Sequence, residues 1–321
     1  MKVKYGNILL ATVFSIIAAV AVSCSEKAEK EHVTDSAMTF QVEQTQLSKV
    51  TANGEWDGNE RIAVKIGTKI KEYHATNRSG STATIEGISA EQTHWWQNTS
   101  SVEVMAWMVG SEYHTDLEKI GGWSDQSSSD KLAASDFLFV PPTTCTFGTV
   151  NALGFLHQMS KIRINLKNEG VLLGANPSEV SVSIGDASNN ITLWGRLNPL
   201  LVDSGNGKYS GLTVRDDLPG GYVQPCRVTA SSGCVSSYEA LLIPQSFAGK
   251  KMIIVTYDGK QYSYIPESGQ PEATVKGGYR REYNVVVNKL GLSVSSGNIS
   301  GWNDGGSTSG SANLKIKFRN E

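Results

Sequence analysis

The chain has 321 residues, long enough for one large or two ordinary domains with buried cores. Its 29 basic and 31 acidic residues give a formal charge of -2, so it lacks the basic surplus that neutralises a phosphate backbone, which argues against nucleic acid as a partner. Charged residues are 19% and apolar residues 39%, with 32 glycines and 9 prolines, a balance that excludes general disorder and favours a turn-rich β protein.

Residues 1–23 are expected to be an export signal rather than part of the fold. Lys2 and Lys4 form a basic start, and residues 8–22 are an apolar run of signal-peptide length that is short for a membrane-spanning helix. The run ends in AVSC, which resembles the lipobox at which bacterial lipoproteins are cut and acylated. We therefore expect Cys24 to carry a lipid such as palmitate. The alternative is an ordinary secretory signal followed by a cysteine.

Residues 24–35 are polar and have no apolar spacing, which predicts a flexible tether between the lipid and the fold. Acidic residues just after the lipid cysteine also resemble the signals that send such lipoproteins to the outer face of the outer membrane. The expected location is therefore the cell surface.

Three further cysteines, Cys145, Cys226 and Cys234, lie in what should be an oxidising compartment, so one disulfide at most can form. The spacing of Cys226 and Cys234 is one that a hairpin could bridge, and the sequence leaves open whether it does. No C-x-x-C motif and no Cys/His zinc spacing occurs. We expect no metal and no cofactor.

Short strand patterns, with period two or continuous apolarity, dominate the rest of the chain. They lie at residues 38–42, 61–66, 102–109, 137–140 and 162–166. The clearest hairpin joins residues 251–257 to residues 260–265, because Asp258-Gly259 readily takes the positive φ angles of a two-residue turn. Helix patterns are limited to turns near residues 90–93 and 130–134, too short to stand alone.

Turn-forming residues at 168–170 and 176–177 fall near the middle of the mature chain and predict a domain boundary near residue 170. The expected organisation is all-β, with an N-terminal domain over residues 36–170 and a C-terminal domain over residues 171–302. Residues 303–321 follow as a Gly/Ser-rich linker and a last strand.

The sequence contains no local signature of catalysis. There is no G-x-S-x-G motif, the five histidines are scattered, and the glycine-rich residues 205–211 have the wrong spacing for a phosphate loop. One aromatic cluster remains. Trp107 lies in a buried-strand pattern, whereas Trp95 and Trp96 are either core residues or a platform that stacks on sugar rings.

Several segments, in order, resemble the fimbrillin family of lipoprotein pilins that build type V fimbriae. They are the lipobox at Cys24, WDGNERIAV at residues 56–64, VMAW at 104–107, LGFLHQMSKIRI at 153–164, YEALLIPQ at 238–245, GGYRREYNVVV at 277–287 and ISGW at 299–302.

The resemblance implies two transthyretin-like (Greek-key) β-sandwich domains in tandem and no enzymatic activity. It places His157 on the last strand of the first domain, where we expect a packed, hydrogen-bonded side chain. It also implies polymerisation by strand exchange, in which a surface protease removes the first strand of a subunit and a strand from a neighbouring subunit fills the groove.

Two segments of this sequence match that exchange, because both present three apolar side chains at alternate positions. The segment to be displaced carries Met38, Phe40 and Val42, and the donor segment carries Leu314, Ile316 and Phe318. Residues 303–311 form a flexible leash before the donor. The alternative is that residues 314–318 pair with their own C-terminal domain as its final strand, with Lys315 and Lys317 facing solvent.

One departure from the family pattern concerns maturation. The best-known type V pilins are cut after an arginine, whereas the matching segment here, residues 47–51, has Lys49 as its basic residue. Gly58-Asn59 also replaces the family's Gly-Asp after the tryptophan. A protease of wider specificity could use Lys49.

The expected function is therefore a lipid-anchored structural subunit of a surface fimbria with a role in adhesion. Its expected partners are other pilin subunits, a maturation protease, the outer membrane and surface ligands of host or bacterial cells. Two other classes stay open: a glycan-binding surface lipoprotein that uses Trp95 and Trp96, and a polysaccharide hydrolase, which would need two carboxylates facing each other across a cleft.

Overall fold

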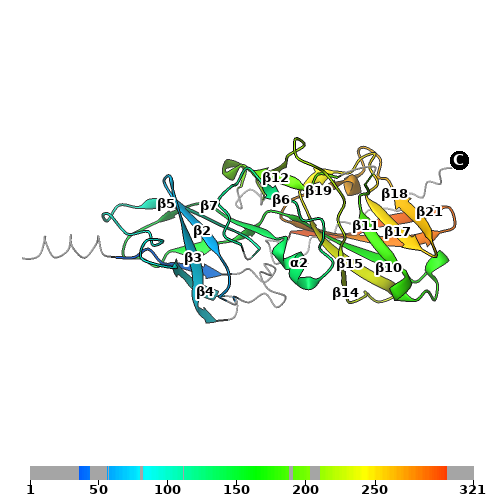
Figure 1. The fold of residues 1–321 in the computed structure, drawn as a ribbon, viewed down its shortest axis with the longest axis horizontal. Coiled ribbons are helices and arrows are strands. Elements are labelled where there is room, and N and C mark those ends of the chain that lie inside the picture. The colour runs from blue at the N-terminus through cyan, green and yellow to red at the C-terminus, as the bar shows by residue number, and fades with distance from the viewer. Residues whose placement is uncertain are drawn as a thin grey trace, which may run out of the picture.

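The structure is a computed structural model that describes residues 36–43, 56, 58–79, 82–110, 112–187, 191–202 and 210–301. These residues form an elongated body made almost entirely of strands (Figure 1). The one α-helix in the described ranges is α2, Ser129–Ala134, which begins where the Ser128 side chain accepts a hydrogen bond from the Lys131 amide. The expected all-β class is confirmed.

The first half of the chain forms an eight-stranded sheet whose inner side chains converge on one core. Its strands in sheet order are β8 (Ala152–Gly154), β1 (Phe40–Glu43), β4 (Thr82–Gly87), β3 (Lys69–Ser79), β2 (Ile62–Ile66), β5 (Val102–Val109), β7 (Phe137–Cys145) and β9 (Leu156–His157).

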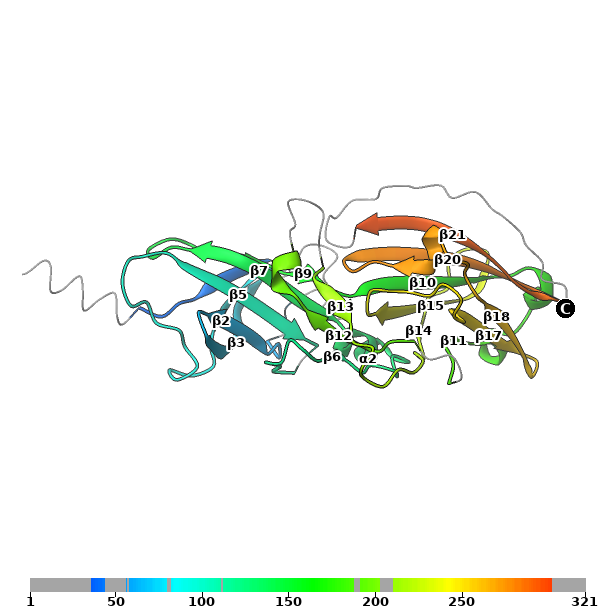
Figure 2. The ribbon, with the colours of Figure 1, turned by 90° about the horizontal axis from the view of Figure 1, so that it is seen from above.

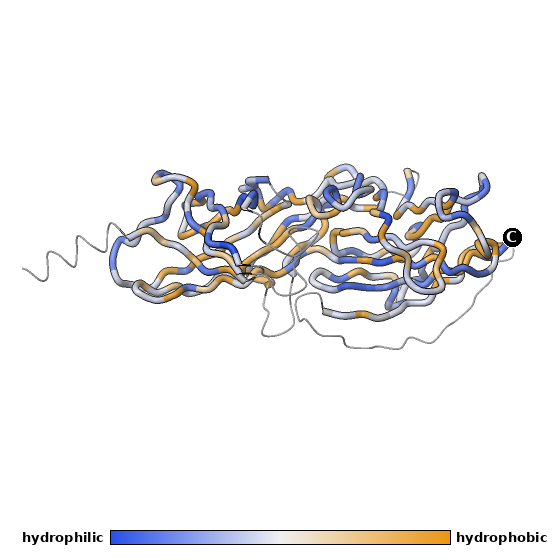
Figure 3. Tube along the Cα trace, turned by 90° about the horizontal axis from the view of Figure 1, so that it is seen from below, coloured by the Kyte–Doolittle hydropathy of each residue, from blue (hydrophilic) through white to orange (hydrophobic). Residues whose placement is uncertain are grey.

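The second half is a sandwich of a five-stranded and a three-stranded sheet (Figure 2). The larger sheet runs β14 (Cys226–Val228), β15 (Cys234–Leu242), β10 (Ser160–Lys167), β20 (Tyr279–Asn288) and β21 (Gly291–Gly301). The smaller sheet runs β11 (Ser181–Ile184), β17 (Ile253–Tyr257) and β18 (Lys260–Tyr264). A two-stranded pair, β16 (Gln245–Ser246) and β19 (Thr274–Val275), lies beside them. Apolar stretches follow the strands of both halves, and many connecting loops are hydrophilic (Figure 3).

The predicted hairpin is confirmed as β17 and β18. Residues Ile253 to Tyr257 pair with residues Lys260 to Tyr264, and the turn between them has φ values of 49° at Asp258 and 69° at Gly259. Two successive positive φ angles define the turn whose twist matches that of the flanking strands. The Asp-Gly dipeptide therefore determines this element locally.

A small sheet joins the two halves. β6 (Ile120–Gly121), from the first half, pairs with β12 (Trp194–Leu197), which pairs with β13 (Leu212–Val214). Gly121 has a φ of 126°, and a Cβ there would lie 2.1 Å from the Leu193 carbonyl oxygen. Only glycine fits this approach. A third hydrophobic cluster contains residues of both halves, among them Trp107, Phe139, Leu212 and Ile243.

A glutamine adds two hydrogen bonds at the same junction. The Gln126 side chain donates to the Leu241 carbonyl at 2.8 Å and accepts from the Leu241 amide at 2.8 Å. It is only 1% exposed, so both bonds lie out of contact with solvent. The two halves are therefore joined by backbone pairing, apolar packing and a bidentate side chain.

The chain passes from the eight-stranded sheet to the five-stranded sheet between His157, at the end of β9, and Ser160, at the start of β10. The change comes earlier in the chain than the boundary near residue 170 expected from turn residues, and the division into domains stays a prediction. His157 is fully buried, with its Nδ1 atom 2.8 Å from a carboxylate oxygen of Asp136. It is the packed, hydrogen-bonded histidine expected there.

Cys145, Cys226 and Cys234 are all free thiols. The sequence leaves open whether Cys226 and Cys234 pair, and in the structure they do not, because Cys226 lies opposite Glu239 on β15 while Cys234 lies opposite Lys167 on β10. The hairpin's register thus holds the two cysteines apart along the strands.

Candidate functional site: the groove that holds the first strand

The first described segment alternates strictly between buried and exposed residues. Met38, Phe40 and Val42 are 4%, 1% and 2% exposed, whereas the intervening Thr39 and Gln41 face solvent. Period-two burial places all three apolar side chains on the core face of the sheet. This is the alternation on which the predicted displaced strand depends.

β1 lies inside the sheet, between two neighbours. It pairs antiparallel with β4, where Phe40 lies opposite Ile85 and Val42 opposite Ala83. On its other side it pairs in parallel with the short strand β8, where Val42 lies opposite Leu153. Removal of β1 would therefore leave an open slot with backbone groups to pair on both sides.

The side chains of β1 contribute to the first core rather than covering it. The Phe40 ring lies 6.0 Å from the Tyr73 ring at an interplanar angle of 44°, and both are among the largest fully buried side chains of the protein. Tilted aromatic pairs at this separation are stabilising beyond the area they bury. The slot thus contains one wide position, at Phe40, with a smaller one at Val42.

A hydrogen-bonded relay fixes the start of the strand. The Tyr73 hydroxyl donates to the Met38 carbonyl at 3.1 Å and accepts from the His94 amide at 3.0 Å. The Met38 amide donates to the His94 carbonyl at 2.8 Å, and the Trp96 amide donates to the Ser36 carbonyl at 3.0 Å. Tyr73 therefore bonds the backbone of both β1 and the segment that carries His94.

Burial sets the protonation of Tyr73 and of the His94 side chain beside it. It raises the pKa of Tyr73 to about 12, so the hydroxyl keeps the proton that it donates. Burial also lowers the pKa of His94, which favours the neutral imidazole. The His94 Nε2 atom lies 3.1 Å from the Val64 carbonyl oxygen, and since a carbonyl only accepts, Nε2 carries the proton.

The two candidate glycan-binding tryptophans have different surroundings. Trp96 is 5% exposed and meets the Phe147 ring edge-on at 5.6 Å. Trp95 is partly exposed, and its indole nitrogen donates to the Ala90 carbonyl at 3.2 Å. A platform of two exposed rings is therefore not present, because core packing takes up Trp96. Trp107 is buried, as its strand pattern predicts.

Five predicted site residues lie outside the described residues. They are Cys24, Lys49, Leu314, Ile316 and Phe318. Lipidation, cleavage and donation of a strand therefore stay predictions from sequence.

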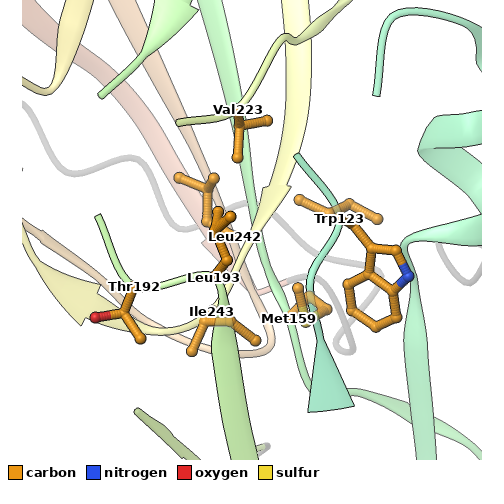
Figure 4. A pocket seen from close by; sticks show the side chains of 8 residues that line it. Trp123, Met159, Thr192, Leu193, Val223, Leu242 and Ile243 are labelled. Atoms are coloured by element: carbon orange, nitrogen blue, oxygen red, sulfur yellow. The ribbon is translucent and has the colours of Figure 1, made fainter. Parts of the chain in front are cut away.

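A small hollow lies at the junction of the two halves, and a larger one lies open at the surface. One, of about 10 Å³, is lined by Trp123, Met159, Thr192 and five other residues (Figure 4), and it holds a single water at most. The other is an open groove of about 500 Å³ beside β16 and β19. The residues that line these two hollows include no carboxylate.

In the described ranges, no group of three or more His, Cys, Asp or Glu side chains could hold a metal ion. No helix there is long and apolar enough to cross a membrane.

Sequence reasoning missed Tyr73 and the role of the His94 backbone. Tyr73 lies in the pattern of buried residues Tyr73 and Ala75 on β3, which indicates a core position but not the partner of its hydroxyl. A buried tyrosine needs a hydrogen-bond acceptor, and only the fold identifies that acceptor as the carbonyl of Met38.

A comparison with family models finds that the fimbrillin-like family matches residues 48–302. Two solved structures are similar in fold. One is a candidate cell adhesion protein from Bacteroides uniformis, with 16% identity and a TM-score of 0.58, covering 84% of this chain and 99% of its own. The other is a candidate cell adhesion protein from Bacteroides ovatus, with 17% identity and a TM-score of 0.54, covering 83% and 98%. Among curated proteins none matches.

Proposed function

The chain belongs to the fimbrillin-like family, and we propose that it is a structural subunit of a surface fimbria with a role in adhesion. In this proposal the subunits polymerise by exchange of one strand. A protease cuts after β1, β1 leaves its slot, and the donor segment of a neighbouring subunit takes its place.

The observation that carries the proposal is the position of β1. It is short and lies between β4 and β8, and together with Met38 just before it, it supplies three buried side chains to the first core. β1 is the first strand of the described residues and is only four residues long, so its removal would not require any other described strand to be unthreaded. The slot that remains is apolar and has unpaired backbone on two sides, so it favours refilling by an extended segment.

The donor segment supplies the complementary pattern. Its apolar residues, Leu314, Ile316 and Phe318, repeat the spacing of Met38, Phe40 and Val42. One register of the donor in the slot would therefore place its three apolar side chains on the core face. A shift by one residue would place Lys315 and Lys317 there instead. The leash of about ten residues spans roughly 15 to 20 Å, enough to leave one molecule and reach another.

Cleavage and anchoring complete the proposal. Lys49 follows β1 in the chain and is the basic residue nearest to its end, so a cut there would separate the first strand from the rest of the domain. The lipid on Cys24 would hold the uncut precursor in the outer membrane, exposed at the cell surface, until that cut releases it for assembly.

The test is polymerisation of the purified chain after limited digestion with a lysine-specific protease. We expect ladders on a denaturing gel that disappear on boiling, and we expect Lys49→Gln to abolish them. Ile316→Asn should also abolish them, whereas Lys317→Asn, on the opposite face of the same segment, should leave them intact. Monomer under every digestion condition, or equal ladders from Ile316→Asn and Lys317→Asn, would contradict the proposal.

A further inference from the structure

β21 forms a long edge of the five-stranded sheet. It runs over eleven residues, Gly291–Gly301, a length of about 35 Å at the usual rise per residue. One side of it pairs with β20 from Gly291 to Gly301, with one irregularity in the register between Ser296 and Ile299. In the described part of the chain, no strand pairs with its other side.

The other sheet edges are short. The opposite edge of the same sheet is β14, with three residues and Arg227 at its centre. The eight-stranded sheet ends in β8 and β9, with three and two residues. Proteins limit unwanted pairing through short edges, charges, prolines and bulges, and of these devices β21 has only the irregularity between Ser296 and Ile299. The β21 sequence, GLSVSSGNISG, contains no charged residue and no proline.

The side chains of β21 define which strand would fit beside it. Leu292 and Val294 pack against the core of the second half, here called the second core, whereas Ser293 and Ser295 alternate with them on the other face. A partner strand must therefore carry apolar residues on one face and small polar residues on the other. A second copy of β21 does so, and it brings no charge that the first copy would repel.

We propose that two copies of this chain associate through β21, with the two strands antiparallel about a two-fold axis perpendicular to the sheet. Such an axis keeps the core faces of both copies on the same side and joins two five-stranded sheets into one of ten strands. The contact uses the same surface of both molecules, so it closes at a dimer. It does not involve β1, and it would join fibres side by side rather than end to end.

The competing occupant is residues 302–321 of the same chain, which follow β21 directly. A segment that pairs with β21 within one molecule would cover the edge permanently. The two arrangements differ in one measurable property, because only pairing between copies depends on protein concentration.

The experiment measures the mass of the purified Lys49→Gln chain in solution over a hundredfold range of concentration. This parent keeps β1 in place, so strand exchange does not contribute. We expect a monomer–dimer equilibrium. Ser295→Lys, near the middle of β21, should weaken the dimer at least tenfold because two like charges meet across the axis. A mixture of Ser295→Lys and Ser295→Glu chains should restore it.

The matched control is Ser181→Lys on β11, an exposed serine on an edge strand of the smaller sheet, which should leave dimerisation unchanged. A second measurement does not depend on any substitution: amide exchange in residues 291–301 of the parent should slow with concentration while exchange in β14 stays constant. A monomer at every concentration, or a dimer that Ser295→Lys leaves intact in the folded protein, overturns the proposal and leaves the proposed fimbrial role untouched.

Discussion

β1 and β21 are the first and last described strands, and they are held in opposite ways. β1 has four residues, lies between two neighbours and buries every second side chain almost completely. β21 has eleven residues, pairs with one neighbour only among the described residues, and its described side chains are half-buried. β1 therefore depends on core packing, whereas β21 depends on its ladder. A strand of the first kind can be replaced only by a segment with the same apolar spacing, and a strand of the second kind accepts an added neighbour.

The largest effect on the free energy of unfolding should come from truncating a core side chain of β1. Phe40→Ala removes a fully buried ring that contacts Tyr73, and we expect it to lower the free energy of unfolding by about 3–5 kcal/mol. Urea denaturation followed by fluorescence measures the change. A loss below about 1 kcal/mol would show that β1 is not an integral part of the first core.

Next comes the relay at the start of β1. Tyr73→Phe keeps the ring but removes the hydroxyl, so the Met38 carbonyl loses its donor and the buried His94 amide loses its acceptor. We expect a loss of about 1–3 kcal/mol in the same assay. Amides of residues 36–43 should also exchange faster, and unchanged exchange there would contradict the role assigned to Tyr73.

On β21 the matching truncation should cost less. Leu292→Ala removes a side chain that is only partly buried against the second core, and we expect a loss of about 1 kcal/mol. If it costs as much as Phe40→Ala, the contrast between a packed strand and a paired strand fails.

The smallest effect should be the pH dependence of the β1 region. Burial lowers the pKa of His94 in the folded state from its ordinary 6.5, so the unfolded chain binds the proton more readily. Stability is then complete above pH 6.5 and falls as the pH drops below that value toward the lowered pKa. Amide exchange should show that β1 opens faster at pH 5 than at pH 7. His94→Gln should reduce this difference between the two pH values.

Local chemistry explains which elements the sequence predicts. The hairpin at β17 and β18 depends on Asp258-Gly259, and the buried face of β1 follows from the alternation at Met38, Phe40 and Val42. The parallel pairing of β1 with β8 and the β6–β12 pairing across the junction were not predicted, because a residue pattern does not contain the identity of a distant partner. Trp96 shows the same limit, since a tryptophan beside another in a loop has the same sequence whether it packs edge-on against Phe147 or faces solvent.

The Gln126–Leu241 contact has a mechanical consequence. With the β6–β12 pairing, it links two halves of an elongated subunit through bonds that would all have to break before one half could swing against the other. Tension along the long axis is shared by both halves instead of opening a hinge between them. If such subunits form the filament proposed above, the contacts between successive molecules would bend more easily than the junction within each one.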